Sequence, residues 1–130
     1  MYRKILALIA ALLTAFAPPL PAHAAVTPQS QLTCQYLLNT WPTGFTADLL
    51  IFNNGPTIDG WTATWTFDTP SQLVAVWSAD MNQSTATVAV ATPMPWNKII
   101  ASGSAVVFGW TALAPKTEVP DDITVNGIPC

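Results

Sequence analysis

Few side chains in this sequence could transfer a proton, attack a substrate or hold a metal ion. The one histidine, His23, lies near the start of the chain, and there are only two cysteines. A pair of carboxylates, as in glycosidases, would be the remaining route to catalysis. Most of the acids, however, lie at expected turns or strand ends, where aspartate commonly stabilises a turn: Asp59, Asp68, Asp80, Asp121 and Asp122. We therefore expect no enzyme activity, no metal and no cofactor.

Tryptophan is unusually abundant, with six residues in a chain of 130. Trp61 and Trp65 alternate with threonines and share their positions with Ala63 and Phe67, which predicts one apolar face of a strand. Trp110 follows Phe108 at the same spacing. We expect these three indoles to be buried.

The other three tryptophans lie near expected strand breaks. Trp41 precedes Pro42, Trp77 ends a short apolar run, and Trp96 lies between Pro95 and Asn97. Prolines stiffen the backbone and withhold hydrogen-bond donors from a sheet, so we expect Trp96 to stand on a loop surface. Exposed aromatic clusters mark binding surfaces. The alternative, that these rings are buried beneath loops, stays open at this point.

The first 24 residues have the pattern of an export signal. Arg3 and Lys4 precede an apolar run over 5–17, prolines interrupt it, and a small-x-small sequence ends at Ala24. The run is shorter than the roughly 20 apolar residues of a membrane-spanning helix, which is the alternative. We expect a signal peptide over 1–24, a short lead over 25–33, one domain over 34–130, and a secreted product.

Cys34 and Cys130 are the only cysteines, and they bracket the expected domain. In an exported protein an even pair is most simply a disulfide, here joining the two ends of the domain. The alternative of two free thiols or a metal pair stays open, although zinc would need further ligands.

Without its leader the chain has two lysines and seven carboxylates, a net charge of −5. Phosphate recognition depends on clustered Lys and Arg, so nucleic acid and anionic membrane surfaces are poor candidate partners. Charged residues make up only 8% of the sequence, which suits a neutral ligand. A monomer is the default expectation.

Short strands that alternate with turns are predicted along the whole domain. Runs rich in Val, Thr and aromatic residues are separated by Pro, Gly and Asn, with no helical period. This pattern is typical of an all-β antiparallel sandwich of the immunoglobulin-like or jelly-roll type. The predicted strands are 32–38, 45–51, 61–67, 73–78, 85–91, 104–111 and 123–126.

An ordered set of short motifs resembles the family 2 bacterial carbohydrate-binding modules over residues 34–130. The matching pieces run, in order, from Cys34 through Asn39-Thr40-Trp41-Pro42-Thr43-Gly44-Phe45, Asp59-Gly60-Trp61-Thr62, Trp77-Ser78, Pro95-Trp96-Asn97 and Phe108-Gly109-Trp110 to Val125-Asn126-Gly127-Ile128-Pro129-Cys130. The sequence departs from the family pattern at Ala75, where Gln is common, and at Lys98, where Gly is usual.

The resemblance implies a β-sandwich closed by a terminal disulfide. In the cellulose-binding subgroup three surface tryptophans form a row, which here would be Trp41, Trp77 and Trp96. Asn39 would contact sugar hydroxyls, with Asn97 and Gln83 as further candidates.

From the resemblance we expect a free-standing, non-catalytic module for crystalline cellulose or a related insoluble polysaccharide such as chitin. Such modules usually accompany glycoside hydrolases. The alternative from the residues alone is a protein–protein adhesion module that uses the same aromatic patch.

Overall fold

The computed structural model describes residues 15–19 and 31–130, and every regular element in these ranges is a β-strand. The predicted signal peptide falls largely outside the described residues. The strands are β1 (Leu32–Trp41), β2 (Gly44–Asn53), β3 (Ile58–Asp59), β4 (Ala63–Thr66), β5 (Gln72–Trp77), β6 (Ala79–Gln83), β7 (Val88–Pro93), β8 (Ile99–Ile100), β9 (Ala105–Leu113), β10 (Thr124–Val125) and β11 (Ile128–Pro129).

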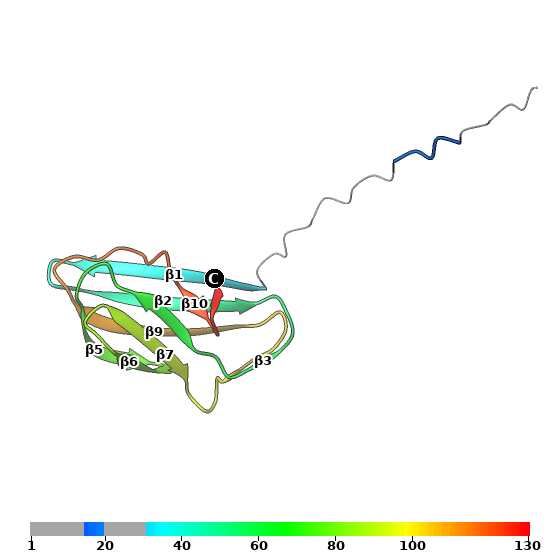
Figure 1. Cartoon of the computed structure of the whole chain (residues 1–130). Coiled ribbons are helices and arrows are strands. Elements are labelled where there is room, and N and C mark those ends of the chain that lie inside the picture. Colours follow the sequence, from blue (N-terminus) through cyan, green and yellow to red (C-terminus); the bar gives the residue numbers. More distant parts are fainter. Residues whose placement is uncertain (1–14, 20–30) are drawn as a thin grey trace, which may run out of the picture.

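Two antiparallel sheets form a sandwich, which confirms the predicted fold class. The four-stranded sheet has the order β1-β2-β9-β5 (Figure 1), and the five-stranded sheet has the order β11-β10-β4-β7-β6. β3 and β8 form a separate two-stranded ribbon. Within the described ranges there is no helix with the length and apolar character needed to cross a membrane.

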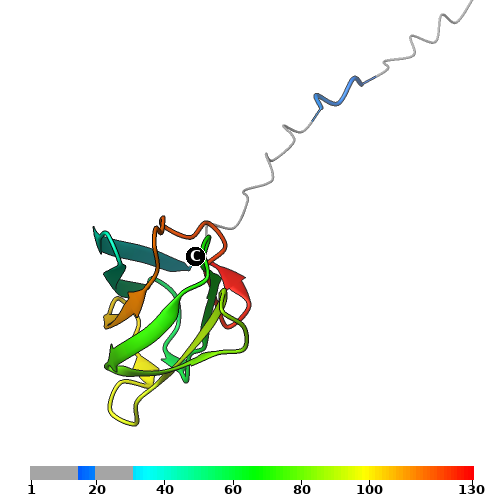
Figure 2. The same ribbon diagram turned by 90° about the vertical axis from the view of Figure 1, so that its left-hand side faces the viewer.

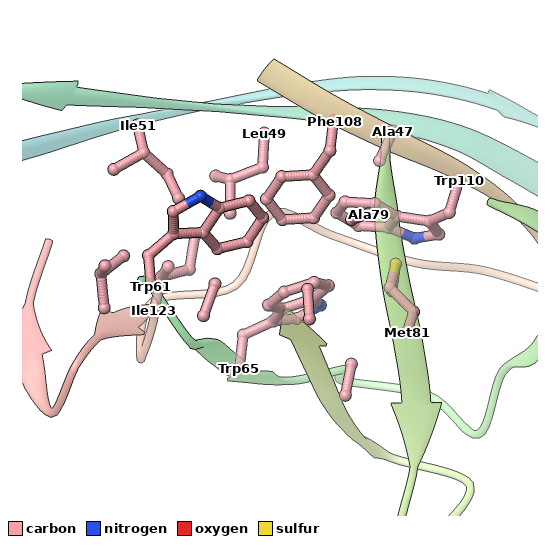
Figure 3. Close-up of a cluster of buried hydrophobic side chains, with 14 of the residues drawn as sticks. Ala47, Leu49, Ile51, Trp61, Trp65, Ala79, Met81, Phe108, Trp110 and Ile123 are labelled. Carbon is pink, nitrogen blue, oxygen red and sulfur yellow. The ribbon is translucent and has the colours of Figure 1, made fainter. Parts of the chain in front are cut away.

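The sandwich core is aromatic, as the alternation of Trp61 to Phe67 predicts. Trp61, Trp65 and Trp110 are at most 1% exposed, so the prediction that they are buried is confirmed. Figure 3 shows their rings packed around Phe108, which stacks on Trp61 with ring centres 5.1 Å apart. Trp65 lies beneath Trp110 at 4.7 Å. This packing joins β9 of one sheet to β4 of the other.

Tyr36 extends this core towards β1. Its ring meets Trp110 edge-on at 5.5 Å, and its hydroxyl is buried without a hydrogen-bond partner among the described residues. Burial, with a smaller contribution from the negative charge of Asp68, raises the pKa of the phenol far above its usual value. Tyr36 therefore stays neutral and serves packing.

The predicted disulfide between Cys34 and Cys130 is present, with a Cα–Cα distance of 5.3 Å. In both ribbon views the C-terminus lies close to the point where the sandwich begins (Figures 1 and 2). Since β1 and β11 are edge strands of different sheets, the bond joins the two sheets as well as the two ends of the domain.

Beyond shifts of one to three residues at the ends of the predicted strands, the structure differs from the sequence-based prediction in three places. β1 continues through Trp41, which was predicted to lie in a break, because Trp41 still pairs with Gly44 before the chain turns. β6 was not predicted, although Ala79 and Met81 are buried and the residues between and after them are exposed. The very short β3, β8 and β11 were also missed.

Candidate functional site

The outer face of the four-stranded sheet carries two of the three candidate tryptophans. Phe45 and Ala47 of β2 point into the core, so the alternate residue Gly44 points outwards, and Trp41 pairs with it. Phe108 and Trp110 of β9 likewise point inwards, so Gly109 points outwards and Trp77 of β5 pairs with it. Trp41 and Trp77 therefore share one face.

Each of these rings lies against a glycine on the neighbouring strand. A Cβ atom built on Gly44 would come within 3.1 Å of the Trp41 indole, and one on Gly109 would overlap the Trp77 indole. Trp41 is 39% exposed and Trp77 is 40% exposed. One side of each ring is thus supported by backbone, and about two fifths of each side chain is open to solvent.

A short polar row separates the two rings. Asn39 pairs with Thr46, and Thr46 pairs with Thr111, all on the outer face between the rows that hold Trp41 and Trp77. The hydroxyls of Thr46 and Thr111 are 3.3 Å apart and hydrogen-bonded. Strand spacing and rise place the Cα atoms of Trp41 and Trp77 about 20 Å apart, diagonally across the sheet. Hydroxyl groups therefore lie midway between two aromatic surfaces.

Trp96 is the most exposed of the three, at 70%, and lies in the turn between β7 and β8. The next residue, Asn97, fixes this turn. Its side-chain Oδ1 accepts from the Met94 N–H at 2.8 Å, and its Nδ2 donates to the Ser78 carbonyl at 2.7 Å. Ser78 directly follows Trp77, so Asn97 ties the Trp96 turn to the end of β5.

Two further features hold Asn97 in place. Its carbonyl accepts a hydrogen bond from the buried Trp61 indole N–H at 3.0 Å. Ser78 has a φ of 64°, a left-handed conformation that costs energy for a residue with a side chain and directs its carbonyl. The core, the end of β5 and the Trp96 turn are therefore linked through one residue, Asn97.

The structure does not support direct sugar contacts by Asn97 or Gln83. Asn97 is 8% exposed, and both ends of its amide bind backbone. Gln83 accepts from the Leu73 N–H at 3.2 Å and donates to the Ser71 carbonyl at 2.7 Å, which ties β6 to the start of β5. Gln83 therefore positions two strands, and Asn97 positions the Trp96 turn. Asn39, in contrast, is exposed on the outer face two residues before Trp41.

Sequence reasoning missed the glycines beneath the rings and the hydroxyl pair. Thr46 alternates with Phe45 and Ala47 in the sequence, but only the pairing of β2 with β9 brings Thr111 beside it. A bulge in β5 between Leu73 and Ala75 also hides the direction of Trp77, since it shifts the alternation by one residue. Sheet register is the missing information in both cases.

We expect replacement of Asn97 by alanine to loosen the Trp96 turn. Two hydrogen bonds to partly buried backbone groups would be lost, which lowers the free energy of unfolding by about 2 kcal/mol. Because Trp96 is no longer tied to Ser78, quenching of its fluorescence by acrylamide should increase. Asn82→Ala, on the exposed side of β6, is the matched control and should change neither quantity. Equal stability of the two variants would contradict the positioning role.

Comparison with known proteins agrees with this architecture. Residues 32–130 match the family model described as "Cellulose binding domain". Exoglucanase A of Cellulomonas fimi is 34% identical over 117 residues, which cover 84% of this chain and 13% of that enzyme. Chitinase 63 of Streptomyces plicatus is 31% identical over 126 residues, or 96% of this chain and 19% of that enzyme. The chain thus spans less than a fifth of the length of either relative.

A solved structure gives the same result for the fold. The chitin-binding domain of Chi18aC from Streptomyces coelicolor superposes with a TM-score of 0.64 and 27% identity, covering 77% of this chain and 94% of that domain. With the family model matching nearly the whole sandwich, the chain belongs to the cellulose binding domain family.

Proposed function

We propose that this protein is a secreted, non-catalytic module that docks on crystalline cellulose or a related insoluble β-glycan such as chitin. The observation that carries the proposal is the placement of the exposed tryptophans. Trp41 and Trp77 lie against glycines on one face of the sheet, and Asn97 fastens the Trp96 turn to the end of β5. Membership of the family and the names of the two relatives support the class of ligand.

The physical basis is a match between indole faces and sugar ring faces. A β-linked glucan presents axial C–H groups on its ring faces and hydroxyls around its edges, so an indole can cover the apolar patch and release water. The face is already formed on paired strands, so docking on an ordered surface costs little conformational entropy. Asn39 and the hydroxyls of Thr46 and Thr111 are positioned to bind the hydroxyls at the sugar edges.

Secretion is supported by the disulfide together with the leader pattern in the sequence. A bond between Cys34 and Cys130 requires an oxidising compartment in which to form and persist. The same exported state would bring the module into contact with polymeric substrates, which do not enter cells.

The test is depletion of the full chain from solution by microcrystalline cellulose, chitin and xylan. Trp41→Ala, Trp77→Ala and Trp96→Ala should each weaken adsorption to the preferred polymer about tenfold, since each removes an aromatic anchor. Ile128→Ala is the control, because Ile128 is exposed at 50% but lies on β11 of the other sheet.

If the three tryptophan variants adsorb as strongly as the Ile128→Ala control, the exposed tryptophans do not form the binding surface. Adsorption to none of the three polymers would instead favour the adhesion-module alternative, in which the same rings contact a protein.

A further inference from the structure

A hollow of about 400 Å³ opens beside Trp41, at the end of β1. Its volume falls within the roughly 300–1,000 Å³ of small-molecule sites. Trp41 forms part of its wall, so the hollow is continuous with the face that we propose as the polymer-binding surface. The other lining residues come from the β1–β2 turn and from the segment after β9: Thr40, Pro42, Pro115, Lys116 and Thr117.

Hydrogen bonds on both sides of Lys116 hold this wall in place. The Ala114 N–H donates to the Thr43 carbonyl at 3.1 Å, which fastens the segment after β9 to the β1–β2 turn. On the other side, the Thr117 hydroxyl donates to Oδ1 of Asp68 at 3.3 Å. Lys116 therefore lies in a segment that is positioned before any ligand binds, which lowers the entropy cost of binding.

The positive charge of Lys116 is available to a ligand. Within residues 31–130 the other lysine, Lys98, pairs with Asp59 at 3.8 Å, whereas Lys116 makes no ion pair. Asp68, the carboxylate that contacts this segment, already accepts two hydrogen bonds from it. An ammonium group that borders a hollow can give several charge-assisted hydrogen bonds to an anion that enters it.

The shape of a polymer stacked on Trp41 determines which sugar atoms reach this charge. The indole covers the face of one sugar ring, so the groups at the ring edge project sideways past the indole. The edge group that extends furthest is the one at C6, which is a hydroxymethyl in a neutral sugar and a carboxylate in a uronic acid. Because Lys116 and Trp41 border the same hollow, a C6 group that enters it meets the ammonium.

We propose that the hollow beside Trp41 is a subsite for sugar carboxylates and recognises uronic acid units in a chain that lies on the tryptophan face. Lys116 donates hydrogen bonds to the C6 carboxylate and is the specificity-determining residue. Without its leader the chain has a net charge of −5, which suits a largely neutral polymer with scattered carboxylates better than a polyanion. The proposal rests on the proposed function and adds a subsite to the same face.

The test uses the polymer that the wild type prefers, cellulose or chitin, before and after light oxidation of its C6 hydroxyls to carboxylates. Lys116→Gln should weaken adsorption of the full chain to the oxidised polymer about fourfold, because an ion pair is lost. Its adsorption to the unoxidised polymer should change less than twofold. Lys116→Arg should adsorb like the wild type. Lys98→Gln is the matched control, since it removes the same charge outside the hollow, and should also adsorb like the wild type.

The outcomes separate this proposal from the proposed function. Equal losses for Lys116→Gln and Lys98→Gln on the oxidised polymer would show a general effect of charge and overturn the subsite. Wild-type adsorption by Lys116→Gln to the oxidised polymer would overturn it as well, while adsorption to the unoxidised polymer would still support the proposed function. Failure of the wild type to adsorb to either unoxidised polymer would overturn the proposed function, and this proposal with it.

A competition experiment locates the carboxylate along the sugar chain. Oligosaccharides oxidised at C1 carry their carboxylate at a chain end, and they should displace the wild type from the oxidised polymer no better than neutral oligosaccharides do. Better displacement that disappears in Lys116→Gln would place the bound carboxylate at a chain end and overturn the assignment to uronic acid units.

Discussion

Reduction of the disulfide between Cys34 and Cys130 is expected to lower the free energy of unfolding by about 4 kcal/mol. The two cysteines are separated by 96 residues. In the chain-entropy model a closed loop of about 100 residues is worth up to ~4.7 kcal/mol, because it restricts the unfolded chain. The free energy of unfolding of a domain of this size is typically only about 5–15 kcal/mol, so the disulfide supplies a large share of it.

Urea unfolding followed by tryptophan fluorescence would measure this loss, with and without reductant. The melting temperature should fall by about 20 °C on reduction. A Cys34→Ala/Cys130→Ala variant should match the reduced wild type and should not respond to reductant. Coincident unfolding curves for oxidised and reduced protein would show that β1 and β11 are held together without the bond.

The core of this fold could be predicted from sequence because its alternation is regular. Trp61, Ala63, Trp65 and Phe67 repeat at every second position, and all four are buried. β6 escaped prediction because its two inward residues, Ala79 and Met81, give a weak apolar signal between polar neighbours. Strands of two residues, such as β3 and β8, are too short for any periodicity to appear.

The candidate site was predicted in composition but not in arrangement. Prolines around Trp96 correctly indicated an exposed loop, since its ring is 70% exposed. The role of Asn97 could not be read from the sequence, because its partner Ser78 lies 19 residues away. The position of Asp48 beside Trp77 likewise depends on the pairing of β9 with both β2 and β5.

The second large prediction concerns the contact between the Trp77 ring and Gly109. Gly109→Ala should lower the free energy of unfolding by about 2 kcal/mol, because the added methyl group overlaps the Trp77 indole and the ring or the strand must move. The displaced ring should also weaken adsorption to the preferred polymer about tenfold, as loss of an aromatic anchor does. Asp48 also meets the new methyl group, but a carboxylate at the end of a side chain can rotate away.

A double-mutant cycle distinguishes this effect from a general loss of strand stability. In a Trp77→Ala background the ring is absent, and Gly109→Ala should cost less than about 0.5 kcal/mol or stabilise the strand, since alanine restricts the unfolded chain more than glycine does. The coupling energy between the two positions should therefore be at least about 1.5 kcal/mol. Additive effects of Gly109→Ala and Trp77→Ala on unfolding would mean that the indole does not lie on Gly109 in solution. The proposed stacking surface at the end of β5 requires that contact. Additive effects would therefore contradict the part of the binding model in which a sugar ring stacks on Trp77.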